Sequence, residues 1–153
     1  MQVFILRHGE AQLFADSDAE RALTSVGYQQ TLEILAASKA ELSKVTRIVA
    51  SPYVRAQQTA ALVAEMLALP LETSPLLVPE GNLAEVTQLL ETLSQETPLL
   101  VSHQPLVGTL VDWFCGLPRG RQVMGTSALA AIEADVVAGA CGELRWLRQP
   151  GSS

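Results

Sequence analysis

Short apolar runs alternate with longer segments of helical periodicity along this chain, and this alternation restricts its fold more than any other feature. Runs typical of buried strands occupy residues 3–6 ("VFIL"), 46–51 ("TRIVAS") and 97–103 ("TPLLVSH"), and residues 71–80 offer a short strand and a loop. Because these runs are continuously apolar, the strands are expected to be covered on both faces of a largely parallel sheet. The sequence therefore predicts an α/β fold with one domain over residues 1–153, a three-layer sandwich around a mostly parallel central sheet.

Start signals mark the helices between these strands. The predicted helices cover residues 24–42, 52–67, 82–94 and 105–117. Thr24 and Ser51 are suited to cap the first two helices, and Pro52 to the first helical position. Asn82 and Glu85 stand at capping-box spacing before the third. The spacing thus predicts where each helix begins.

The first helix and the end of the chain carry further patterns. Apolar residues at helical spacing predict the buried face of the first helix: Tyr28, Leu32, Leu35 and Ala36. Residues 126–135 and 142–149 are expected to form a closing pair of strands around a glycine-containing turn.

Composition excludes several classes of function. The chain has 48% hydrophobic residues, 17% charged residues and a formal net charge of −6, which is typical of a globular protein and unfavourable for binding a nucleic acid backbone. No stretch reaches the roughly 18 apolar residues of a membrane span, and the first run is too short for a signal peptide. We therefore expect a cytoplasmic protein that binds neither nucleic acid nor membrane, with Cys115 and Cys141 as reduced thiols.

Both histidines of the chain, His8 and His103, follow directly after predicted strands. Ligands of such sheets bind beyond the carboxyl ends of the strands, so both imidazoles are expected at the functional edge, with Arg7 beside the first. Arg55 falls in the first turn of the second helix, where a cation loses about 0.3–1 kcal/mol against the helix dipole unless an anion is bound there. Two arginines converging with two histidines predict a phosphate pocket.

Less specific interpretations stay open for the same residues. A zinc site at His8 and His103 would need a third ligand, and none stands at a familiar spacing. Arg55 alone would be expected to pair with a surface acid such as Glu20 or Glu65. The set of residues points to phosphate more strongly than any member does.

Four segments in order, "RHGE", "LTSVGYQQ", "SPYVRAQQTA" and "VSHQPLVG", resemble the histidine phosphatase superfamily and its phosphoglycerate-mutase-like fold. Among its members, this short chain is similar to the bacterial phosphohistidine phosphatases. The resemblance implies that His8 is the nucleophile that accepts the phosphoryl group, while Arg7, Arg55 and His103 bind its oxygens. Arg21, just before "ALTSVG", corresponds to a further basic residue of such a pocket.

The chemistry expected of this site needs no metal and no cofactor. A neutral imidazole attacks phosphorus when one ring nitrogen is unprotonated and the other is held by a hydrogen bond, here expected from a backbone carbonyl near Gly9. The arginines and His103 would stabilise the charge that spreads over the phosphoryl oxygens. Glu80 is the candidate general acid for the leaving group, and it is also readable as a solvated loop glutamate.

The short connection over residues 68–82 predicts the substrate class. Larger mutases and sugar phosphatases insert a lid there, and this chain has no room for one. An uncovered site favours phosphohistidine on a partner protein, such as a phosphotransfer domain or a phosphocarrier. The alternatives are a small-molecule phosphomonoesterase and, outside the enzymes, a phosphate-binding or phosphoprotein-binding module.

Overall fold

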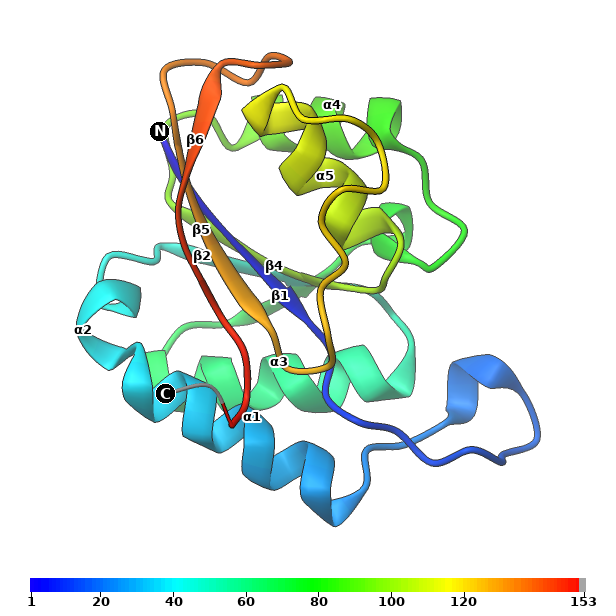
Figure 1. Cartoon of the computed structure of the whole chain (residues 1–153). Coiled ribbons are helices and arrows are strands. Elements are labelled where there is room, and N and C mark those ends of the chain that lie inside the picture. Colours follow the sequence, from blue (N-terminus) through cyan, green and yellow to red (C-terminus); the bar gives the residue numbers. More distant parts are fainter. Residues whose placement is uncertain (152–153) are drawn as a thin grey trace.

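The central sheet has six strands in the order β3-β2-β4-β1-β5-β6, and helices cover both of its faces (Figure 1). The computed structural model describes residues 1–151. The strands are β1 (Gln2–Arg7), β2 (Arg47–Ala50), β3 (Leu71–Thr73), β4 (Pro98–Ser102), β5 (Leu129–Ala134) and β6 (Gly142–Arg148). The helices are η1 (Asp18–Glu20), α1 (Ser25–Ala37), α2 (Lys39–Leu42), α3 (Val54–Leu67), η2 (Pro75–Leu77), α4 (Leu83–Thr92) and α5 (Leu106–Cys115).

Strand direction divides the sheet into two parts. β3, β2, β4 and β1 run parallel to one another, as expected of strands joined by helices. β5 pairs antiparallel with β1, and β6 antiparallel with β5, so the predicted closing pair of strands is confirmed. The predicted α/β sandwich with a mostly parallel sheet is confirmed as well.

β1, β2 and β4 bury side chains on both faces, which explains why their sequences are almost continuously apolar. In β1, Val3 and Ile5 belong to the core formed with α4 and α5. Phe4 and Leu6 face the opposite way, into the core formed with α1 and α3. These are the three layers visible in Figure 1, with α1, α2 and α3 below the sheet and α4 and α5 above it.

The first predicted helix differs from the observed one in length and in buried face. It divides at Ser38 into α1 and α2, where the buried Ser38 hydroxyl accepts a hydrogen bond from Arg148 Nη1 at 2.9 Å. The buried residues of α1 are Gly27, Thr31, Ile34 and Leu35, and Leu32 is half exposed. The predicted face was therefore wrong apart from Leu35: two small residues, with no strong apolar signal, turn toward the sheet.

Helix starts agree with the sequence at two of the three predicted caps. Thr24 Oγ1 accepts from Gly27 N at 3.0 Å, and Asn82 Oδ1 accepts from Glu85 N at 2.9 Å. The cap predicted at Ser51 was wrong: α3 begins at Val54, and the Ser51 hydroxyl is bonded to a histidine instead.

A close backbone contact joins α1 to the segment that follows β1. A Cβ atom on Gly9 would lie 2.8 Å from the Gly27 carbonyl oxygen, and one on Gly27 would lie 2.2 Å from the Glu10 carbonyl oxygen. Only glycine fits this contact, because real Cβ atoms do not approach backbone oxygen so closely. Across residues 1–151, no helix is long and apolar enough to cross a membrane.

Gly27→Ala is expected to destabilise the protein although it lies inside a helix. Alanine favours an exposed helix interior by about 1 kcal/mol over glycine, but here its methyl group would overlap the Glu10 carbonyl. We expect a net loss of about 1–3 kcal/mol in the free energy of unfolding, measured by urea denaturation. The exposed Gln29→Ala of the same helix is the matched control and should change stability by about 0.5 kcal/mol or less; an equal effect of both variants would contradict the close contact.

Candidate active site

The two histidines lie side by side where β1 and β4 end. The amide of His8 donates to the Ser102 carbonyl at 3.1 Å and so extends the pairing of the two strands. The imidazole rings of His8 and His103 are 4.9 Å apart between centroids and inclined by 55°. Both side chains are buried, His8 with 6% and His103 with 1% of its surface exposed. The strand ends therefore bring both predicted histidines to one place.

A hydrogen bond fixes the tautomer of His8. Its Nδ1 lies 2.7 Å from the Gly9 carbonyl oxygen, which only accepts, so Nδ1 carries the proton. Nε2 is unprotonated, and its lone pair accepts a long hydrogen bond of 3.4 Å from Arg55 Nε. The Gly9 amide in turn donates to Thr59 Oγ1 at 3.0 Å, which holds the turn in place. The backbone carbonyl expected near Gly9 is thus Gly9's own.

Burial keeps His8 uncharged. Desolvation lowers its pKa from 6.5 to about 4, and the nearby cations Arg55, Arg7 and Arg21 act in the same direction, while the bond to Gly9 opposes them. At neutral pH the side chain is a neutral imidazole with a free Nε2, the protonation state that a nucleophile requires.

His103 is held by the serine that was expected to cap α3. Its Nε2 lies 2.8 Å from Ser51 Oγ, and that oxygen accepts from the Tyr53 amide at 3.2 Å. When the Ser51 hydroxyl donates its own proton to Nε2, the ring proton of neutral His103 lies on Nδ1. Desolvation and the neighbouring His8 lower the pKa of His103 to about 3, so it also is neutral at pH 7.

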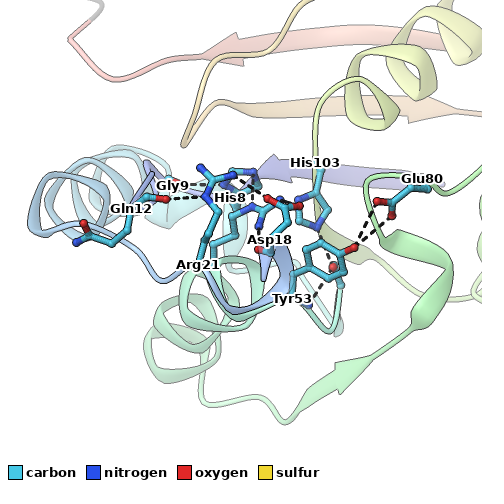
Figure 2. Close-up of polar contacts among 10 residues, drawn as sticks. His8, Gly9, Gln12, Asp18, Arg21, Tyr53, Glu80 and His103 are labelled. Atoms are coloured by element: carbon cyan, nitrogen blue, oxygen red, sulfur yellow. Dashed lines mark hydrogen bonds and ion pairs between the residues drawn. The ribbon is translucent and has the colours of Figure 1, made fainter. Parts of the chain in front are cut away.

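Asp18 bridges Arg55 and Arg21, and Figure 2 shows Asp18 close to Arg21. Asp18 Oδ2 accepts from Arg55 Nη2 at 3.2 Å, its carbonyl oxygen accepts from Arg55 Nη1 at 2.6 Å, and its Oδ1 accepts from Arg21 Nη1 at 2.8 Å. Hydrogen bonding to Arg21, followed by that to Arg55, lowers the pKa of this carboxyl. The surface pairing of Arg55 with Glu20 or Glu65 is not what the structure shows: the guanidinium points into the site.

Arg7 is anchored from the other side of the pocket. Its Nη1 donates to the Met124 carbonyl at 2.9 Å, and desolvation together with the charge of Arg55 lowers its pKa. Across residues 1–151, two buried polar side-chain atoms have no hydrogen-bond partner: Arg7 Nε and His103 Nδ1. Both belong to this site, and an oxyanion would satisfy Arg7 Nε and, in the tautomer protonated at Nδ1, His103 as well.

Five of the six predicted site residues line one open pocket of about 410 Å³: Arg7, His8, Arg21, Arg55 and His103. Glu80 does not line it, although the preceding Pro79 does. Its carboxylate accepts from the Tyr53 hydroxyl at 3.3 and 3.4 Å, and Figure 2 shows it beside Tyr53, away from His8 and Arg21. Glu80 therefore lies beside the pocket, next to Tyr53 and the lining residue Pro79, and is not part of the lining itself.

Two contributors to the site were missed from the sequence. Asp18 lies in a polar stretch without periodicity, and its spacing of three from Arg21 was the one available signal. Ser51 was noticed only as a helix cap, and the ring that it holds comes from another strand. Among residues 1–151, no group of three His, Cys, Asp or Glu side chains is arranged to hold a metal ion.

Comparisons with known proteins agree on one family. The model of the histidine phosphatase superfamily (branch 1) matches residues 3–79. The chain is 38% identical over 140 residues to the phosphohistidine phosphatase SixA of Escherichia coli K12, covering 88% of this chain and 86% of that protein. It is 40% identical over 123 residues to a SixA homolog of Haemophilus influenzae, covering 72% and 75%. A solved structure of the protein histidine phosphatase SixA complexed with tungstate superposes with a TM-score of 0.88 at 36% identity, over 98% and 97% of the two chains.

Because both histidines are buried as neutral imidazoles, the protein should become less stable as the pH falls. Their pKa values in the folded protein, about 4 for His8 and about 3 for His103, lie below the ordinary 6.5. Below pH 6.5 the unfolded chain therefore binds protons that the folded one does not. We expect the contribution of the two histidines to the free energy of unfolding to be complete above about pH 6.5. As the pH falls toward 4, the free energy of unfolding should decrease by up to about 1.4 kcal/mol per pH unit for each histidine.

Urea denaturation between about pH 7 and 5 measures this slope. In His103→Asn the slope of the unfolding free energy against pH should decrease by the equivalent of up to one bound proton. The titration of carboxylates is common to both proteins and cancels in the comparison. Identical slopes in the two proteins would show that His103 is not buried as the neutral imidazole.

Proposed function

The chain belongs to the histidine phosphatase superfamily, and from this membership we propose that it is a phosphohistidine phosphatase, a hydrolase that removes the phosphoryl group from histidine on a partner protein. The similarity to SixA supports this assignment. One observation carries the mechanism: His8 Nδ1 is bonded to the Gly9 carbonyl, which leaves Nε2 unprotonated in a pocket lined by three arginines.

In the first step, His8 Nε2 attacks phosphorus of the bound phosphohistidine. A new N–P bond forms, and the P–N bond to the substrate imidazole breaks. When the other nitrogen of that substrate ring carries a proton, the leaving group departs as a neutral imidazole. The Gly9 carbonyl stabilises the positive charge that the His8 ring gains in the attack, since it accepts a hydrogen bond from Nδ1 at 2.7 Å.

In the second step, water attacks phosphorus and the bond to His8 breaks. The electron pair returns to Nε2, the water proton passes to the phosphate or to solvent, and inorganic phosphate is released. Because Nδ1 keeps its proton throughout, His8 leaves as a neutral imidazole and the enzyme returns to its starting state.

Charge stabilisation comes from the cations and from His103. The phosphoryl oxygens carry the negative charge of the transition state, so preorganised donors in a partly buried site act strongly on it. Arg55 is positioned next to the attacking nitrogen. Arg7 Nε and His103 Nδ1 have no hydrogen-bond partner in the described chain, so Arg7 Nε, and His103 Nδ1 when it carries the ring proton, can donate to the phosphoryl oxygens. Arg21 completes the lining of the pocket.

The open pocket favours a protein substrate. Between α3 and α4 the chain forms β3, η2 and turns. Two hydrogen bonds hold this connection to the sheet: Ser74 N donates to the Ala50 carbonyl, and Ser102 Oγ donates to the Leu77 carbonyl. Of residues 68–82, Pro79 alone lines the pocket around His8. We place the activity in the cytoplasm, in signal transduction or a phosphotransferase relay, where phosphotransfer domains and phosphocarriers bear phosphohistidine. The free thiols of Cys115 and Cys141 fit a reducing compartment.

His8→Ala is expected to abolish turnover through the covalent route. Rapid quench with a labelled phosphodonor should trap a base-stable, acid-labile phosphoenzyme in the wild type and none in the variant, and kcat/KM should fall by roughly 10⁴-fold or more. A chelator should leave the wild-type rate unchanged. Wild-type turnover by His8→Ala would sink the proposal, and activity lost to a chelator and restored by zinc would favour the metal site instead.

Glu80→Gln is expected to separate the two substrate classes. An imidazole leaves without help from an acid, whereas an alkoxide needs a proton. We expect the variant to lose kcat/KM at least tenfold, about 1.4 kcal/mol, on an alkyl phosphate and to stay near the wild-type rate on a phosphorylated phosphotransfer domain.

The exposed Glu91→Gln on α4 is the matched control and should affect neither substrate. Equal losses of kcat/KM on both substrates would show that Glu80 is not the general acid. Wild-type preference for a sugar phosphate over the phosphorylated domain would instead favour the small-molecule phosphomonoesterase, and binding of both without turnover would favour a phosphate-binding module.

A further inference from the structure

A second hollow adjoins the phosphate pocket. This groove has a volume of about 370 Å³ and lies between the first residues of α4, the start of α5 and the 117–125 loop. Gln104, which follows His103, lines both hollows. A molecule whose phosphoryl group reaches His8 therefore has this groove directly beside it.

The groove has an apolar part and a cationic part. Leu83, Pro105 and Leu106 supply its apolar surface, and Arg119 is the charged residue among its lining. Within the described chain, none of the lining residues carries a carboxylate. Its chemistry thus fits a segment that is partly apolar and negatively charged.

Arg119 and its neighbour Arg121 are uncompensated cations in an acidic protein. Within residues 1–151 neither side chain makes a hydrogen bond or an ion pair, whereas Arg47, Arg145 and Arg148 each pair with a glutamate. The chain as a whole carries a formal charge of −6. Half of its ten Lys and Arg residues lie either in the phosphate pocket or in this loop: Arg7, Arg21, Arg55, Arg119 and Arg121.

The wall that carries these cations is fixed relative to the catalytic residues. Gln122 N donates to the buried Asp112 carboxylate at 3.0 and 3.3 Å. A Cβ atom on Gly108 would lie 2.1 Å from the Gln122 carbonyl oxygen, so the loop packs directly on α5. Two residues farther on, the Met124 carbonyl accepts from Arg7. The groove and the phosphate pocket therefore share one supporting segment.

We propose that this groove docks an acidic segment of the partner protein that flanks its phosphohistidine. The inference rests on the proposed function, because it concerns how the protein substrate is recognised. Carboxylates of the partner would meet Arg119 and Arg121, and its apolar side chains would cover Leu83 and Leu106. Charges at the rim of an interface act mainly through steering and specificity, so the effect should appear in kcat/KM and depend on salt.

Two matched phosphohistidine peptides test the inference. One carries glutamates on both sides of the phosphohistidine and the other glutamines, and both are phosphorylated with phosphoramidate. For the wild type we expect kcat/KM to be at least tenfold higher on the acidic peptide, with the preference shrinking as salt is added. In the double variant R119E/R121E the ratio of kcat/KM on the acidic peptide to kcat/KM on the glutamine peptide should fall to about one or below. The ratio for R119Q/R121Q should lie between those of the wild type and of R119E/R121E.

The double variant K39E/K44E makes the same change of charge at two exposed lysines in and beside α2, before β2 begins, and should keep the wild-type ratio. Thermal unfolding verifies that each variant is folded. A wild type that hydrolyses neither peptide nor a phosphorylated protein would overturn the proposed function itself. A wild type that hydrolyses both peptides equally, or a ratio that K39E/K44E lowers as much as R119E/R121E, would overturn the docking groove. A change of oligomeric state in R119E/R121E would assign the groove to a second copy of the chain instead.

Discussion

The hydrogen bond from His8 Nδ1 to the Gly9 carbonyl is the contact on which the rest of the site depends. It decides which ring nitrogen is free, and thus where a phosphoryl group can be accepted. The turn that presents this carbonyl packs against α1 at Gly27, where a Cβ atom on either glycine would overlap backbone oxygen. Backbone packing between a helix and the end of a strand therefore sets the protonation of a side chain.

The positive charge around the His8 imidazole is partly neutralised by a carboxylate of the same site. Desolvation is the main cause that keeps both histidines neutral, and the charges of Arg55 and Arg7 act in the same direction. Asp18 offsets part of this charge while it orients Arg21 and Arg55 through the same carboxylate. Net positive charge is left for a phosphoryl dianion, and the arginines hold their geometry before it arrives, which is the condition for preorganised electrostatic stabilisation.

The sequence was sufficient to predict the site residues that directly follow strands. It was not sufficient to predict the residues whose position depends on contacts between distant segments. Continuous apolar runs located β1 and β4, so His8 and His103 were placed correctly together with Arg55 at the start of α3. The buried face of α1 was wrong because Gly27 and Thr31 give no hydrophobic signal. Asp18 and the bond from Ser51 to His103 depend on loops folding over the sheet, and periodicity carries no information on them.

The reversed direction of β5 explains why one loop serves both hollows. A strand added parallel to β1 would place its preceding loop at the amino ends of the parallel strands, away from the site. Because β5 runs antiparallel and begins opposite Leu6, the segment before it reaches the carboxyl edge, where Ser127 N donates to the His8 carbonyl at 3.1 Å. Met124 thereby comes within reach of Arg7, and Arg119, farther back in the same loop, lines the adjoining groove. The topology that closes the sheet also brings a further arginine to the hollow beside the phosphate pocket.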